Sequence, residues 1–170
     1  MNKLYILCGI PFAGKTTLAK GLEKRLGFLR IDLDDIKFEL LGDDVKDEDM
    51  EQSQWDKVYL EMYKKIEEGL KQGKNVVSDT GNFTKHERDL LRNIASKIVI
   101  DSMVIFVYTP VNIVKQRWQE NKETNKRFHI SEKSFSGAVK ELEIPGNDEN
   151  VIIYDGSVSV DKWLQNLRDL

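Results

Sequence analysis

Apolar residues along this chain gather in short continuous runs, separated by longer segments in which they recur every three to four positions. Continuous apolar runs of this length predict strands that are covered on both faces. The predicted strands are Leu4–Cys8, Asn75–Ser78, Met103–Tyr108 and Val151–Tyr154, with Phe28–Ile31 as a weaker fifth run.

The segments between these runs predict helices, because their apolar residues fall on one face at helical spacing. Thr84 and Glu87 have the spacing of a capping box. Thr109 followed by Pro110 predicts an N-cap with proline in the first helical position. The other predicted helices are Thr16–Leu26, Glu51–Leu70, Ser131–Glu143 and Ser159–Leu167.

Strands that alternate with helices imply right-handed crossovers and a parallel sheet with helices on both faces. The pattern therefore predicts a three-layer α/β fold. We find no internal repeat, low-complexity tract or linker in the sequence, so we expect residues 1–170 to form a single domain. The acidic stretch Asp43–Glu51 is expected to be the most mobile loop.

Composition narrows the class of protein. The net charge of −3 in 170 residues argues against a protein that binds polyanions through bulk electrostatics. Cys8 is the single cysteine, so no internal disulfide can form, and a reducing compartment is expected. The apolar stretch Ile98–Val107 is interrupted by Asp101 and is too short to span a bilayer. We therefore expect a cytoplasmic protein without a signal peptide.

A glycine-rich stretch follows the first predicted strand and matches the pattern G-x-x-x-x-G-K-[ST]. Glycines allow a tight turn in which successive backbone N–H groups point at a phosphate, and the following helix directs its positive end to the same place. Lys15 would then reach the β- and γ-phosphates, and the Thr16 hydroxyl would bind Mg²⁺. The stretch predicts a site for ATP, formed by Gly9, Ile10, Pro11, Phe12, Ala13, Gly14, Lys15, Thr16 and Thr17.

Acidic residues follow the second predicted strand. Because ligands lie beyond the carboxyl ends of parallel strands, Asp34 or Asp35 could accept a proton from an acceptor hydroxyl. Lys37 is close enough along the chain to help bind that acceptor. The alternative is that Asp34 caps a helix over Ile36–Leu41.

Another acid, Asp79, ends the predicted strand Asn75–Ser78. An acid in this position can hold Mg²⁺ directly or through water. It could instead belong to an acceptor pocket, or cap a turn with Gly81.

A basic segment at about 115–130 is predicted to form a helical lid. Phosphoryl transfer spreads negative charge over the γ-oxygens, which an arginine from a lid can neutralise. Arg117 and Arg127 are the candidates, since arginine binds phosphate in a more defined geometry than lysine. We expect Lys122 and Lys126 to face solvent.

Four stretches together give the chain a family resemblance: GIPFAGKTT, IDLDDIK, VVSDTGNFTKHERDLLR and VYTPVNIVKQRWQENK. They resemble the small P-loop kinases of the AAA-type ATPase-like group, which include polynucleotide 5′-kinases, zeta toxins and chloramphenicol phosphotransferases. The resemblance implies a five-stranded parallel sheet, ATP as donor and a hydroxyl acceptor. By position, Asp34 matches the general base, Asp79 the acid at a strand end, Arg88 a substrate-side arginine in the next helix, and Arg117 a lid arginine.

Some positions differ from the polynucleotide kinases. Lys37 and Gly81 stand where those enzymes have arginine and asparagine, and Asn121–Lys122 replaces a second lid arginine. These differences favour an acceptor other than a nucleic-acid end. The leading hypothesis is an ATP-dependent kinase acting on a hydroxyl of a small molecule or nucleotide. The alternatives are a polynucleotide 5′-hydroxyl kinase and a module that binds ATP without transferring phosphate.

Overall fold

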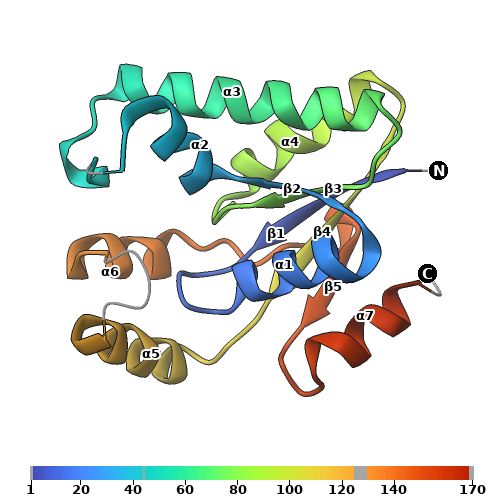
Figure 1. Ribbon diagram of the computed structural model, residues 1–170. Coiled ribbons are helices and arrows are strands. Elements are labelled where there is room, and N and C mark those ends of the chain that lie inside the picture. Colours follow the sequence, from blue (N-terminus) through green and yellow to red (C-terminus); the bar gives the residue numbers. More distant parts are fainter. Residues whose placement is uncertain (1, 44, 125–129, 169–170) are drawn as a thin grey trace.

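The computed structural model describes residues 2–43, 45–124 and 130–168, and it is built around a five-stranded parallel sheet (Figure 1). The strand order is β2-β3-β1-β4-β5. The strands are β1 (Lys3–Cys8), β2 (Leu29–Asp32), β3 (Val76–Asp79), β4 (Asp101–Val107) and β5 (Val151–Tyr154). The parallel five-stranded sheet expected from the resemblance is confirmed.

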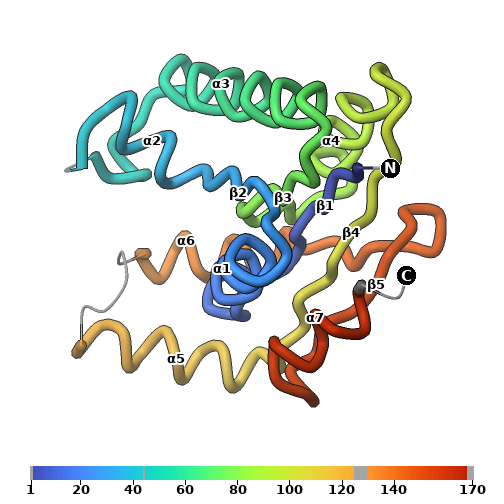
Figure 2. Tube along the Cα trace, turned by 45° about the vertical axis from the view of Figure 1, so that its right-hand side comes forward, coloured from blue at the N-terminus to red at the C-terminus, as the bar shows by residue number. Residues whose placement is uncertain are grey.

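Helices cover both faces of the sheet, as the continuous apolar runs predicted (Figure 2). The helices are α1 (Lys15–Leu26), α2 (Leu33–Leu41), α3 (Gln52–Lys71), α4 (Lys85–Lys97), α5 (Val111–Thr124), α6 (Glu132–Glu141) and α7 (Val160–Arg168). Two short 3₁₀ turns, η1 (Asp47–Asp49) and η2 (Asn147–Glu149), precede α3 and β5.

The central strand β1 divides the core into two halves. Tyr5 and Leu7 pack toward α1, α5, α6 and α7, whereas Leu4, Ile6 and Cys8 pack toward α2, α3 and α4. Side chains alternate between the faces of a strand, so a strand that is buried on both sides must be apolar throughout. This explains why the first run in the sequence lies at the centre of the sheet.

Helix ends follow the sequence in one case and depart from it in two. The predicted capping box of Thr84 and Glu87 is present at α4. The Thr109 hydroxyl does not cap α5: it donates to the carbonyl of Ala13. Asp32, and not Asp34, caps α2, because its carboxylate accepts from the backbone N–H groups of the two aspartates that follow.

None of the helices in the part of the chain described above has the length and apolarity needed to cross a membrane.

Candidate active site at the glycine-rich loop

The glycine-rich loop joins β1 to α1 at the carboxyl edge of the sheet. Gly9 has φ +151°, and a Cβ atom there would lie 2.6 Å from the carbonyl oxygen of Val107. Gly14 has φ +109° and precedes the first residue of α1. These two positions need glycine, for close approach and for backbone conformation respectively. The first turn of α1 therefore presents N–H groups without intrahelical partners to the space above the loop.

Lys15 is folded over this loop. Its Nζ donates to the carbonyl oxygens of Gly9 at 2.7 Å and Ile10 at 2.9 Å. Burial lowers the pKa of Lys15 to about 8, although the charges of Asp79, Cys8 and Asp34 oppose that shift. The ammonium is thus held next to the position that a phosphate would occupy.

Thr16 and Asp79 lie together, as a magnesium site requires. The Thr16 hydroxyl donates to Oδ1 of Asp79 over 3.4 Å, from α1 to the end of β3. Asp79 is buried, which raises its pKa, while Arg30, Lys15 and Thr16 act in the opposite direction. A hydroxyl and a carboxylate at the edge of a phosphate loop are the oxygen ligands that Mg²⁺ prefers, so these residues fit the ion.

Arg30 is a site residue that the sequence reasoning missed. Its Nε donates to Oδ2 of Asp79 at 2.8 Å, and its guanidinium also contacts Asp32 and Asp35. The only signal in the sequence was a cation inside the weak apolar run Phe28–Ile31. Arg30 links the carboxyl ends of β2 and β3 and holds the Asp79 carboxylate in place.

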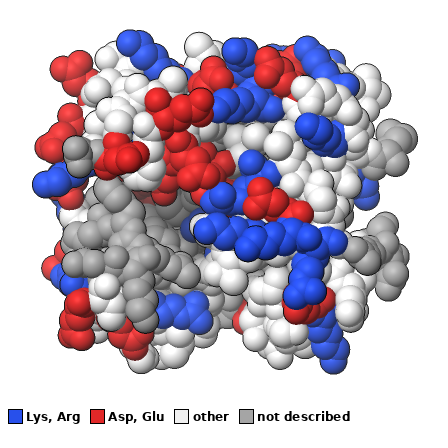
Figure 3. Space-filling view, viewed as in Figure 1, with Lys and Arg blue, Asp and Glu red and all other residues white. Residues whose placement is uncertain are grey.

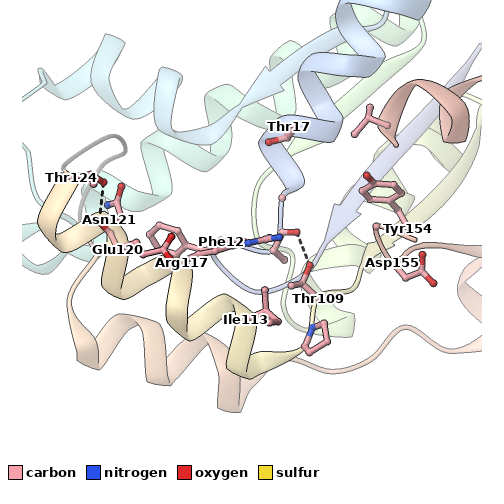
Figure 4. A pocket seen from close by; sticks show the side chains of 15 residues that line it. Phe12, Thr17, Thr109, Ile113, Arg117, Glu120, Asn121, Thr124, Tyr154 and Asp155 are labelled. Atoms are coloured by element: carbon pink, nitrogen blue, oxygen red, sulfur yellow. Dashed lines mark hydrogen bonds between the residues drawn. The ribbon is translucent and has the colours of Figure 1, made fainter. Parts of the chain in front are cut away.

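A first cavity of about 580 Å³ lies between α5 and the segment that follows β5 (Figure 4). Phe12 and Thr17 come from the glycine-rich loop and α1, and Tyr154 and Asp155 lie on the opposite side. Arg117 lines this cavity from α5, and its Nη1 donates to the carbonyl of Phe12 at 3.1 Å. Arg117 therefore lies beside the loop, in this cavity and not in the one that holds the acids.

A second cavity of about 750 Å³ lies on the other side of the loop. It brings together Lys15 and Thr16 from α1, Asp34 from α2 and Asp79 from β3. The space-filling view shows acidic side chains gathered over α2, above a hollow in this face (Figure 3). The residues that the sequence assigned to phosphate binding, metal binding and proton transfer thus line one space.

Asp34 and Asp35 both reach this second cavity from the first turn of α2. The side chain of Asp34 is 60% exposed and that of Asp35 71%. Asp34 contacts Lys37, whereas Asp35 contacts Arg30. Neither carboxylate caps α2, so both stay candidates for the proton acceptor.

Lys37 does not present its ammonium to the cavity, which corrects the substrate contact expected for it. Its side chain is fully buried, and Nζ donates to Asp34 at 3.0 Å and Asp47 at 2.6 Å. It also lies over the ring of Phe38, with 4.8 Å between Nζ and the ring centroid. Lys37 therefore orients two carboxylates.

Arg88 is likewise placed away from the cavity, in contrast to the substrate contact that the resemblance implied. It is fully buried, with Nε and Nη2 on the Glu149 carboxylate at 2.6 and 3.0 Å. Nη1 donates to the carbonyls of Asn82 and Phe83, both at 3.0 Å. Arg88 thus holds the segment after Asp79 to η2.

The predicted lid falls partly on described residues. Of the segment 115–130, α5 carries Arg117, and its Trp118 ring stacks on Phe135 of α6 at 5.1 Å between centroids. Arg127 and Lys126 lie outside the described residues. Whether the two helices close over a ligand stays a prediction.

A parallel sheet of this order, with a glycine-rich loop between β1 and α1, defines the fold of the small P-loop kinases. A family model described as an AAA domain matches residues 4–145, most of the chain. The chain belongs to that family, and the resemblance to small P-loop kinases of the AAA-like group is confirmed.

Solved structures share the fold at low sequence identity. Kti12 of Chaetomium thermophilum, in complex with ADP-AlF₃, is 17% identical, with a TM-score of 0.70 over 98% of this chain and 97% of that one. The APS kinase CysC of Mycobacterium tuberculosis, in complex with AMPPNP and APS, is 16% identical, with a TM-score of 0.69 over 99% and 96%. A chain of the Pnkp1/Rnl/Hen1 RNA repair complex is 22% identical, with a TM-score of 0.69 over 83% and 44%.

Proposed function

We propose that this protein is an ATP-dependent kinase that transfers the γ-phosphate to a hydroxyl of a small molecule or nucleotide. One observation carries the proposal: Lys15, Thr16, Asp34 and Asp79 line the same cavity, on the carboxyl edge of the sheet. Phosphoryl transfer needs positioning, neutralisation of charge and a proton acceptor, and these four residues supply those parts. The nucleotide complexes of the similar folds support the choice of donor.

The nucleotide is proposed to lie across the glycine-rich loop. Its phosphates would bind to the N–H groups at the start of α1 and to Lys15, which would leave Gly9 and Ile10 as the phosphates enter. The first cavity continues from Phe12 and Gly14 and has room for the base and ribose beside Arg117. The acceptor then occupies the second cavity, facing the γ-phosphate.

In the proposed reaction, the acceptor hydroxyl oxygen forms a bond to the γ-phosphorus. The bond from this phosphorus to the β–γ bridging oxygen breaks, and ADP leaves with that oxygen. Asp34 accepts the hydroxyl proton. Lys15 stabilises negative charge that develops on the phosphate oxygens.

Thr16 and Asp79 are proposed to hold Mg²⁺, which when bound neutralises charge on the phosphates. Asp79 binds such an ion in its deprotonated form, and the contact from Arg30 favours that form. Arg30 is therefore proposed to oppose the effect of burial on the pKa of Asp79 and to orient its carboxylate toward the ion.

The polynucleotide 5′-kinase alternative gains support from the likeness to the RNA repair chain. The acidic lining of the second cavity argues against it, because a nucleic-acid end carries phosphates that need cationic partners. The binding-module alternative differs in needing no proton acceptor. Replacing the proposed proton acceptor, Asp34, therefore distinguishes the two functions, because the change would impair a kinase and leave a binding module intact.

Asp34→Asn is expected to lower the transfer rate by about 10²- to 10⁴-fold, because the variant cannot take the hydroxyl proton. Binding of ATP is expected to stay within about twofold. The measurement is transfer of labelled γ-phosphate across a set of nucleosides, sugars and amino sugars. Glu39→Gln, on the same helix but outside the cavity lining, is the matched control and should retain most of the rate. Asp35→Asn is measured beside it at saturating acceptor, so that the two candidate bases are compared. Equal rates for Asp34→Asn and the wild type would remove Asp34 from the mechanism, and a loss confined to Asp35→Asn would make Asp35 the base.

The lowered pKa of Lys15 predicts how nucleotide binding depends on pH. Below about pH 8 the ammonium is charged and attracts phosphate, and above that value it loses its proton in the free protein. Affinity for AMPPNP should therefore fall as pH rises through 8, approaching about tenfold per pH unit. Lys15→Arg stays charged and should flatten the profile, as titration calorimetry from pH 6.5 to 9.5 would reveal. A profile of the wild type that is flat over this range would contradict the assignment.

A further inference from the structure

The acceptor half of the second cavity is the part opposite the glycine-rich loop. Asp34 and Asp35 line it from α2 and Asp47 from η1, whereas Trp55 and Tyr59 line it from the first half of α3. The proposed function requires an acceptor here but does not say which chemical class it belongs to. The charged and aromatic side chains of this half indicate the chemical class of the acceptor.

The cation nearest to these acids is already shared. Lys37 contacts the carboxylates of Asp34 and Asp47 with one ammonium, over 3.0 and 2.6 Å. Its side chain is fully buried, so it cannot turn toward a ligand without leaving both partners. Two carboxylates therefore face the cavity with the compensation of one positive charge.

Arg30 is shared in the same way at the ends of β2 and β3. Its guanidinium contacts three carboxylates, those of Asp32, Asp35 and Asp79. Among the described residues, Arg30 and Lys37 together contact five carboxylates, so two positive charges face five negative ones. Lys15 and Lys20 line the cavity from α1, the helix that follows the glycine-rich loop. The acceptor half keeps an excess of negative charge.

Aromatic side chains complete this half. Trp55 and Tyr59 lie side by side on α3, with 6.1 Å between ring centroids, and Phe83 lines the same cavity. Carboxylates next to aromatic faces bind alkylammonium groups, since the ring faces and the carboxylates attract the same cation. Within the described part of the chain, the cation that contacts Asp34 and Asp47 is the buried Lys37, so an anionic acceptor would lie against two carboxylates, and like charges placed together are costly.

We propose, on the basis of the kinase function above, that the acceptor is an aminated alcohol: a sugar or cyclitol whose protonated amine contacts Asp47 and Asp35 while its hydroxyl faces Asp34. The amine replaces the missing positive charge of the acceptor half. The rings of Trp55 and Tyr59 cover the carbon face of the acceptor. Recognition of the amine thus directs one hydroxyl to the γ-phosphate.

Binding, measured separately from transfer, tests the class of acceptor. The full chain, saturated with AMPPNP and Mg²⁺, is titrated by calorimetry with glucosamine, 2-deoxystreptamine and kanamycin A. The matched neutral probes are the N-acetylated forms of the same compounds, and glucose 6-phosphate is the anionic probe. We expect at least one amine to bind ten times more tightly than its N-acetylated form, with affinity that falls as salt is added. Absence of binding by all three amines, or equal binding of the neutral or anionic probes, would overturn the inference.

A pair of variants on η1 tests whether Asp47 contacts the amine. Asp47→Asn should weaken binding of the amine about five- to tenfold and leave the affinity for AMPPNP unchanged. Asp49→Asn, on the same turn but outside the cavity lining, should change neither. Thermal unfolding checks that both variants are folded, and Asp35→Asn provides a second test that leaves the contacts of Lys37 in place. Unchanged amine affinity in both Asp47→Asn and Asp35→Asn would overturn the assignment of the site. Transfer of phosphate to a neutral alcohol would uphold the kinase while refuting the amine.

Discussion

Lys15→Met is expected to lower the rate of phosphate transfer by about 10²- to 10³-fold and to weaken ATP binding. The ammonium lies over the glycine-rich loop and is the cation that α1 directs at the proposed phosphate position. Removing one such charge from a preorganised site has effects of this size. The measurement is the steady-state rate of γ-phosphate transfer, together with the dissociation constant for AMPPNP.

Lys20→Met is the matched control for this variant. Lys20 lies further along the same helix, is exposed and lines the same cavity. Its replacement by methionine removes one positive charge, as Lys15→Met does. We expect its rate and affinity to stay within about threefold of the wild type. Equal losses in the two variants would mean that general electrostatic attraction, and not the loop, accounts for the effect.

Arg88→Met is expected to destabilise the protein by about 3–5 kcal/mol, because it leaves the Glu149 carboxylate buried without a partner. The side chains of Arg88 and Glu149 are 0% and 1% exposed. The measurement is the free energy of unfolding from chemical denaturation. Arg92→Met, on the same helix, removes a partly exposed contact with Asp89 and should cost less than about 1 kcal/mol.

The double variant Arg88→Met, Glu149→Leu separates a structural role from a substrate contact. Replacing both members of a buried ion pair with apolar residues removes the uncompensated charge, so much of the stability should return. Transfer activity should return with it, since Arg88 is fully buried and does not line the cavity. A stable double variant without activity would restore the substrate role that the resemblance implied.

The strands and the glycine-rich loop could be predicted because their signals are local. Leu4–Cys8 is apolar at every position and short, which is typical of a strand buried on both faces. The loop depends on a fixed spacing of Gly9, Gly14 and Lys15. The strand end at Asp79 could be predicted for the same reason. Each of these features is set by neighbours along the chain.

The sequence could not predict the partners of the buried cations, because those contacts join distant positions. Arg88 meets Glu149 across 61 residues, and Arg30 meets Asp79 across 49. The cap of α2 was missed for a different reason: three aspartates in four positions satisfy the same local preference, and only the strand end at Asp32 distinguishes them. Lys37 was misplaced because its burial depends on Asp47, beyond the end of its own helix.

Titration calorimetry of the folded chain with AMPPNP, in the presence and absence of Mg²⁺, tests the central claim most directly. The account predicts one nucleotide per chain, tighter binding when Mg²⁺ is present, and loss of that magnesium effect in Asp79→Asn. Folded protein that takes up no purine triphosphate analogue at millimolar concentration, with or without Mg²⁺, would contradict it.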